Sequence, residues 1–157
     1  MRESIEIVDA DFNNPSHGDA IVVLVDAYAR DPMGGAAPLR EEVRRALLPA
    51  LQAHPTALAA LAFAGPQPVG VAVGFIGFST FAARPLLNIH DLAVLPTHRR
   101  RGVGRRLLTH LEAKARALGC CKLTLEVRED NGGAQRLYRD VGFADEGTPT
   151  RFWTKRL

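Results

Sequence analysis

The segment from residue 86 to residue 119 constrains the fold more than any other part of the sequence. Residues 86–94 (LLNIHDLAV) predict a strand, which Pro96 closes. A helix is predicted from near Gly102 to Gly119, because apolar residues recur there at helical spacing: Val103, Leu107, Leu108, Leu111 and Ala115. Gly102 and Gly104 lie at the predicted start of this helix, where an anion can approach the free backbone amides closely. The segment therefore predicts either an anion site or a tight turn with solvated arginines.

The distribution of charge favours the anion site. The net charge is +3, but residues 1–98 carry −4 and residues 99–157 carry +7. Clustered like charges are costly without a counter-anion, which favours one compact polyanion such as a phosphate-rich cofactor. A nucleic-acid surface would spread its basic residues along a face and add stacking aromatics, whereas aromatic residues are only 6% here. We therefore expect no nucleic-acid partner. Five arginines lie within eight positions: Arg99, Arg100, Arg101, Arg105 and Arg106.

The overall composition is that of one globular domain, which we expect to span residues 1–157, with 46% apolar and 24% charged residues. The adjacent Cys120 and Cys121 cannot form a disulfide framework. No apolar run reaches the ~18 residues of a membrane helix, and the N-terminus is too acidic for a signal peptide. We expect a cytoplasmic protein with no membrane partner. We also expect no metal, because the histidines lack ligand spacing: His17, His54, His98 and His110.

The remaining periodicity predicts a mixed α/β fold. Helices are expected after Asn14, after Pro38, from Gly102 and over 132–140, where apolar residues recur at helical spacing or capping residues precede them. The order is β-α-α-β-β-β-α-β-α-β-β, which predicts a central sheet with both antiparallel hairpins and βαβ crossings. The expected strands are residues 4–10, 57–64, 69–82, 86–94, 122–127, 143–146 and 151–155.

Arg99-x-x-Gly102-x-Gly104 resembles the Arg/Gln-x-x-Gly-x-Gly/Ala signature of the GNAT superfamily of N-acetyltransferases. The resemblance extends to LAV-x-P before the signature and RLL after it. It also includes Asn131…Ala134…Leu137-Tyr138…Gly142-Phe143, which is similar to the second motif of the family. The matching part is roughly residues 86–143. The resemblance implies a GNAT-like acyl-CoA N-acyltransferase fold, with acetyl-CoA as the co-substrate.

The resemblance also implies where acetyl-CoA binds. Backbone amides of the signature hold its pyrophosphate, and Arg99 adds charge. A strand that splays through a bulge bonds the pantetheine arm with Leu92, Ala93 and Val94. Asn131 bonds the same arm, or is only a turn residue before Gly132. Tyr138 protonates the leaving thiolate, or only anchors a short helix. The signature residues assigned to the cofactor are Arg99, Arg100, Arg101, Gly102, Val103, Gly104 and Arg105.

The implied reaction is direct attack of an amine on the thioester in a ternary complex, which requires a base. His90 is the first candidate, since imidazole changes charge near neutral pH; a structural histidine is the alternative. Asp91 and a chain of water molecules are the other candidates for the base. Strand alternation predicts Asn88, His90 and Leu92 on one face, and Ile89, Asp91 and Ala93 on the other.

The acceptor is expected to be a small basic amine, because the N-terminal part of the chain is acidic. Acetylation of a protein N-terminus or lysine, and a non-catalytic acyl-CoA-binding domain, are the alternatives. Since dimers are frequent in the superfamily, the resemblance leaves a homodimer open. The residues expected to contact the acceptor are Asp31, Met33, Phe81, Asn88 and His90.

Overall fold

The computed structural model describes residues 4–157, which form one five-stranded sheet in the order β1-β2-β3-β4-β5. The first four strands pair antiparallel in sequence order, and β5 pairs parallel with β4. The mixed α/β class predicted from the sequence is confirmed. The strands are β1 (Ile5–Asp9), β2 (Ala57–Ala64), β3 (Gln67–Ser79), β4 (Arg84–Val94) and β5 (Leu123–Leu125).

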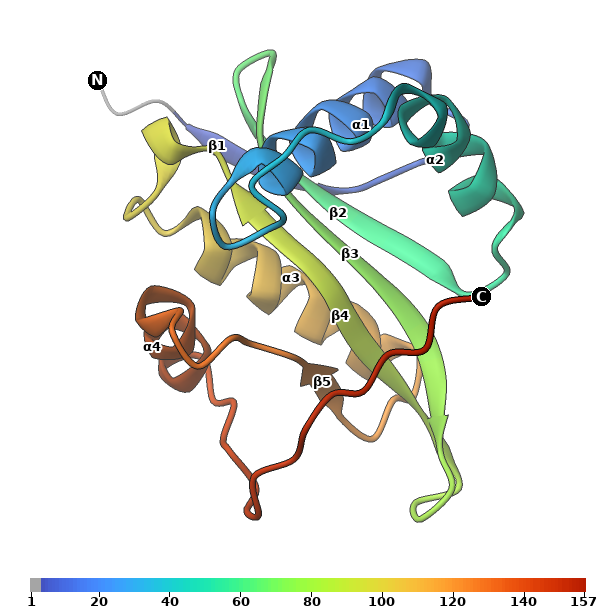
Figure 1. Cartoon of the computed structure of the whole chain (residues 1–157), viewed down its shortest axis with the longest axis vertical. Coiled ribbons are helices and arrows are strands. Elements are labelled where there is room, and N and C mark those ends of the chain that lie inside the picture. Colours follow the sequence, from blue (N-terminus) through green and yellow to red (C-terminus); the bar gives the residue numbers. More distant parts are fainter. Residues whose placement is uncertain (1–3) are drawn as a thin grey trace.

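Helices cover both faces of the sheet (Figure 1). Two of them, α1 (Pro15–Arg30) and α2 (Glu41–Ala53), pack on one face, where Ile21 and Leu24 meet Leu61 and Val71. On the other face α3 (Val103–Ala117) packs through Leu107 and neighbouring apolar residues, with α4 (Gly132–Asp140) beside it. Burial of these two apolar layers is what holds the sheet between the helices.

Local signals set the helix ends. The side chain of Asn14 accepts hydrogen bonds from the amides of Ser16 and His17, and Pro15 occupies the first turn of α1. A short 3₁₀ turn (Pro96–His98) separates β4 from the loop before α3. Within residues 4–157, no helix is both long and apolar enough to cross a membrane.

The last two predicted strands, residues 143–146 and 151–155, do not form. Residues 143–157 adopt neither helix nor strand, and Phe152 and Trp153 are 80% and 85% exposed. Gly147, with a φ of +131°, and Pro149 lie between the two predicted strands. The neighbouring edge strand β5 spans three residues instead of the predicted six, so it offers little backbone for a further strand to pair with.

Candidate active site

A β-bulge lies in the middle of β4. Asp91 pairs with Val73 of β3, and Ile89 pairs with Gly74, so His90 is an extra residue without a register partner. Gly74 is required opposite the bulge, since a Cβ there would lie 2.8 Å from the carbonyl oxygen of Asn88. A bulge of this kind twists the strand and redirects side chains.

The bulge changes which residues share a face of β4. Ile89 packs in the core beneath α3, and so does Leu92, three positions later. Ala93 packs in the core beneath α1, so Asp91, which alternates with Leu92, also points to the α1 side. The predicted alternation, which grouped His90 with Leu92 and Asp91 with Ile89, is wrong because the extra residue shifts the period by one.

Beyond the bulge, β4 separates from β5. The two strands pair only from Leu87 with Leu123 to Ile89 with Leu125, whereas β4 continues to Val94. The chain leaving β5 turns toward α4 instead of following β4 (Figure 1). Residues 90–94 therefore present backbone on their β5 side that no strand among residues 4–157 pairs with. Such an edge can bond an extended, amide-containing ligand as another strand would.

The start of α3 lies at this same end of β4. Gly102, the N-cap of α3, has a φ of +81° and makes no side-chain cap hydrogen bond, and Arg100 also has a positive φ of 62°. The first helical bond runs from the amide of Arg106 to the carbonyl of Gly102, at 3.0 Å. The amides of Val103 and the two residues after it have no partner within the helix. This loop and helix start can accept an anion.

The clustered arginines have different surroundings. Arg99 donates from Nη2 to Asp31 Oδ2 at 2.7 Å and from Nε to the carbonyl of Val94 at 2.9 Å. Arg105 lies 3.3 Å from the Asp140 carboxylate on α4. Arg100 and Arg101 are exposed, at the two positions between Arg99 and the helix cap. The protein therefore supplies carboxylates to part of the cluster.

Gly104 has a packing role that the sequence did not indicate. A Cβ at this position would lie 2.9 Å from Cδ2 of Leu137, so the glycine permits close contact between α3 and α4. Nothing lies within 4 Å of the corresponding point at Gly102. The two signature glycines therefore differ: Gly102 provides a left-handed backbone, and Gly104 provides space.

Tyr138 lies on α4 and packs edge-on against Phe143, with ring centroids 5.8 Å apart. Burial, followed by the charge on Tyr28, raises the pKa of Tyr138 to about 12. Its phenol is therefore protonated at neutral pH and able to donate. Asn131 caps the same helix, because its Oδ1 accepts from the amide of Ala134 at 3.1 Å.

His90 and Asp91 have different environments at the bulge. His90 is exposed, and its ring packs edge-on against Phe75 at 5.9 Å between centroids. Asp91 is half-buried, and this burial raises the pKa of its carboxyl, although a charge on His90 opposes the shift. An exposed imidazole thus lies next to a shielded carboxyl group.

Tyr28 is a site residue that the sequence analysis missed. Burial raises the pKa of its phenol, and the charges of Asp91 and Asp31 raise it further, whereas Arg128 opposes them. Because Tyr28 also acts on Tyr138, the last turn of α1 lies within electrostatic range of both β4 and α4. Its position at the end of the helix that precedes Asp31 and Met33, two of the predicted acceptor residues, was the available signal.

The predicted acceptor residues are only partly brought together. Asp31 and Met33 lie in the α1–α2 loop, where Asp31 is held by Arg99. Asn88 on β4 donates to Thr124 Oγ1 of β5 at 3.0 Å, which joins the two strands just before they separate. Phe81 lies in the β3–β4 turn, fully exposed and at the far end of β4 from Val94. The structure therefore does not bring Phe81 to the bulge.

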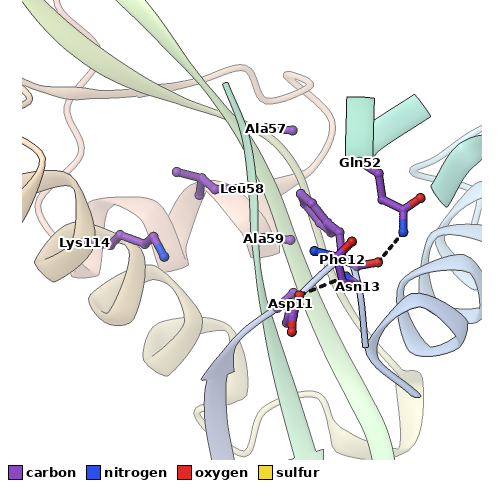
Figure 2. Close-up of a pocket in the computed structure, with 9 residues that line it drawn as sticks. Asp11, Phe12, Asn13, Gln52, Ala57, Leu58, Ala59 and Lys114 are labelled. Carbon is purple, nitrogen blue, oxygen red and sulfur yellow. Dashed lines mark hydrogen bonds between the residues drawn. The ribbon is translucent and has the colours of Figure 1, made fainter. Parts of the chain in front are cut away.

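A separate hollow of about 370 Å³ lies where β1 leaves β2, with Ala57, Ala59, Phe12 and Lys114 among its lining residues (Figure 2). Gln52 donates across it to the carbonyl of Phe12 at 2.7 Å. The hollow lies on the β1 side of the sheet, and β3 separates its β2 lining residues from the bulge in β4. Across the described part of the chain, no three His, Cys, Asp or Glu side chains are grouped to hold a metal ion.

Two solved structures share this fold. An aminoglycoside acetyltransferase, meta-AAC0020, from an uncultured soil metagenomic sample and in complex with sisomicin, superposes with a TM-score of 0.79 at 18% identity, over 97% of both chains. The aminoglycoside N-acetyltransferase AAC(6')-Iy in complex with CoA gives 0.77 at 19% identity, over 98% of this chain and 96% of the other.

Sequence comparison gives the family. N-alpha-acetyltransferase RimI of Mycobacterium tuberculosis is 38% identical over 93 residues, which cover 58% of this chain. The match spans only 57% of that relative. The model of the acetyltransferase (GNAT) family matches residues 23–143, which include the bulge, the α3 loop and Tyr138. The chain belongs to the GNAT family of acetyltransferases.

Proposed function

We propose that the protein transfers the acetyl group of acetyl-CoA to a primary amine of a small basic molecule. The observation that carries this proposal is the splayed end of β4, where unpaired strand backbone lies at the same end of the sheet as the uncapped start of α3. That combination offers one site for an extended amide chain and one for a phosphate anion. The similar fold of AAC(6')-Iy in complex with CoA supports it.

This geometry supports the assignment of the residues that would hold acetyl-CoA, which the family resemblance implies. The amides from Arg100 to Arg105 would bind the pyrophosphate, with the exposed Arg100 and Arg101 adding charge. The backbone of residues 92–94 would bond the pantetheine arm, and an amide near Leu92 or Ala93 would face the thioester oxygen. Asn131 uses its Oδ1 to cap α4, and its side-chain nitrogen would donate to the same arm.

In the proposed reaction acetyl-CoA supplies a thioester that a neutral amine attacks directly. His90 accepts the proton that the amine loses as the C–N bond forms. Tyr138 gives its phenolic proton to the sulfur as the C–S bond breaks, and solvent restores that proton. Asp91 attracts the acceptor as an ammonium ion from the α1 side of β4, where Tyr28 borders it. The ammonium ion gives one proton to solvent before it attacks as a neutral amine.

The choice of acceptor rests on chemistry. Asp91 and the acidic N-terminal part of the chain favour a cationic amine, and meta-AAC0020 with sisomicin is a relative by fold whose ligand is of that kind. A protein N-terminus is the second candidate, because the RimI relative is named for N-alpha-acetylation.

Thiol release from acetyl-CoA tests the proposal. The purified protein would be titrated with acetyl-CoA in a calorimeter and then assayed with two panels, one of polyamines and aminoglycosides and one of short peptides with free N-termini. We expect binding of acetyl-CoA and turnover with at least one basic small molecule. Turnover with peptides alone would mean that the acceptor is a protein N-terminus and not a small basic molecule. Absence of acetyl-CoA binding would overturn the proposal.

A further inference from the structure

One ion pair joins the two loops that border the splayed end of β4. Arg99, in the loop before α3, donates from Nη2 to Asp31 at 2.7 Å and from Nε to the carbonyl of Val94 at 2.9 Å. Asp31 is the C-cap of α1, and its other carboxylate oxygen accepts from the amide of Met33 at 2.9 Å. The side chain of Asp31 is 16% exposed, so the pair is shielded on the Asp31 side. Both carboxylate oxygens of Asp31 therefore already accept a hydrogen bond within the protein.

The segment that Asp31 begins is a folded unit. The amides of Gly34 and Ala36 donate to the carbonyl of Asp31 at 2.9 and 3.1 Å, and those of Gly35 and Ala37 donate to Ala29. The far end is fixed by Asp26, whose Oδ1 accepts from the amide of Leu39 at 2.9 Å. The α1–α2 loop, residues 31–40, therefore has one anchor within the helix layer and one, Asp31, that reaches across to Arg99.

We propose that Asp31 is a positioning residue that transmits cofactor binding to the α1–α2 loop, which rests on the proposed function. Arg99 lies next to Arg100 and three positions before Gly102, both of which have a left-handed backbone. An anion bound on the amides of this loop therefore restrains the backbone that carries Arg99. A restrained Arg99 keeps its bond to Asp31, and Asp31 in turn carries the carbonyl that Gly34 and Ala36 bond. Cofactor binding therefore stabilises the loop beside the acceptor.

This link predicts positive cooperativity between the binding of acetyl-CoA and the binding of the acceptor. A first ligand that has already ordered the loop removes that entropy cost from the second ligand. The expected coupling is in the usual range for linked sites, about 5- to 150-fold in affinity. It needs no contact between Asp31 and either substrate.

Amide hydrogen exchange of residues 33–37, with and without saturating CoA, tests this inference, with calorimetry confirming saturation. In the wild-type protein we expect CoA to slow exchange at Gly34 and Ala36 severalfold. In Asp31→Asn, which keeps the side-chain size but loses the charge, CoA should bind while the slowing disappears. Arg99→Gln removes the other partner of the ion pair and is the variant to measure if Asp31→Asn does not fold. Asp140→Asn is the matched control, because it breaks an Arg–Asp pair of the same cluster, Arg105 with Asp140, that does not reach the loop.

The outcomes separate the two proposals. If CoA does not bind the wild-type protein, the proposed function fails and this inference with it. If CoA binds but exchange at residues 33–37 is unchanged, or slows equally in Asp31→Asn, only the link is overturned. Faster exchange on binding would mean that the phosphates compete with Asp31 for Arg99, which also overturns it. Slowing that persists in Asp140→Asn and is lost in Asp31→Asn supports it.

Discussion

At the scale of single residues, burial favours the protonated form of two ionisable groups, which suits Tyr138 as a proton donor but opposes the charge with which Asp91 attracts a cation. Burial keeps the Tyr138 phenol protonated by raising its pKa to about 12, and burial also raises the pKa of Asp91. Neither group is fully enclosed, so each can still exchange a proton or meet a substrate. The environment made by α1, β4 and α4 sets both shifts.

Tyr138→Phe should lower turnover while leaving acetyl-CoA affinity nearly unchanged. The substitution keeps the ring that packs on Phe143 and deletes only the proton donor. A general acid typically contributes about 10²- to 10⁴-fold to the rate. Single-turnover thiol release measures the chemical step, with calorimetry and thermal unfolding as controls. Full activity in the variant would reduce Tyr138 to an aromatic anchor.

Asp91→Asn should raise the KM for a cationic acceptor and leave acetyl-CoA affinity unchanged. A lost charge-assisted contact is worth about 1.5–3 kcal/mol, or roughly 10- to 150-fold in KM. In the wild type the carboxylate is lost as pH falls through its raised pKa, so acceptor affinity should weaken with acid at a pH above the ordinary value of 3.8. KM measured against pH in both proteins checks this, and an unchanged profile in Asp91→Asn would contradict it.

His90→Gln should remove a pH dependence from the rate. If His90 is the base, the rate at low acceptor concentration rises with pH as the imidazole loses its proton, and then levels off. Glutamine has a similar size but cannot titrate, so the inflection should vanish and the rate should fall. Both proteins must be assayed on one acceptor, because the amine also titrates. If the variant kept the wild-type pH profile, the base would be Asp91 or water instead of His90.

At the scale of elements, the candidate site depends on where β4 stops pairing with β5 and on where α3 begins. β4 carries an extra residue at His90 and outruns β5, and α3 starts at a left-handed glycine without a side-chain cap. Each feature leaves backbone groups unbonded within the element. Backbone geometry, more than side-chain identity, therefore defines the proposed cofactor site.

Gly102→Val should weaken acetyl-CoA binding by about tenfold or more, since a β-branched residue strains the left-handed backbone and blocks approach to the amides. Gly119→Val is the matched control. Gly119 has a φ of +75° at the other end of α3, and a Cβ added at either glycine would have nothing within 4 Å. Both variants should lose similar stability, roughly 1–2 kcal/mol. Calorimetry compares their affinities, and equal weakening in both would show a global effect.

At the scale of the whole molecule, one buried and one exposed carboxylate join neighbouring elements. Asp26, 6% exposed, binds Arg30, Arg44 and the amide of Leu39, which joins α1 to α2. Asp9 on β1 binds His110 and Lys114 of α3. Polar contacts therefore join α1 to α2 within one helix layer and join α3 to the sheet, in addition to apolar burial.

Asp26→Asn should destabilise the fold by about 2 kcal/mol at neutral pH, the scale of a lost charge-assisted contact with partly exposed partners. The hydrogen bond from Arg30, with that of Leu39, holds the pKa of Asp26 below its ordinary value of 3.8. The wild-type stabilisation is therefore present above that value and is lost as pH falls through the lowered pKa. Urea unfolding at several pH values measures both effects. Asp19→Asn, exposed on the same helix, is the control, and equal loss in the two variants would contradict the prediction.

The sequence by itself determined the local elements and the family. The Arg99–Gly104 signature, the strand before it and the helix after it follow from neighbouring residues, because periodicity, caps and glycines act within a few positions. The two helices of the N-terminal part and the hairpin of β2 and β3 were predicted for the same reason. The expected GNAT family is confirmed by the match over residues 23–143.

Tertiary structure decided which of these residues meet. The bulge at His90 exists only in the pairing of β4 with β3, and it reverses the faces that alternation predicts for Asp91 and Leu92. The predicted terminal strands fail because strand pairing needs a partner edge, and β5 is too short to supply it. Arg99 meets Asp31 across 68 residues of sequence, a contact that no local pattern encodes. Local chemistry therefore specified the elements, whereas long-range packing specified the site, because side chains far apart in sequence come together only when the layers close.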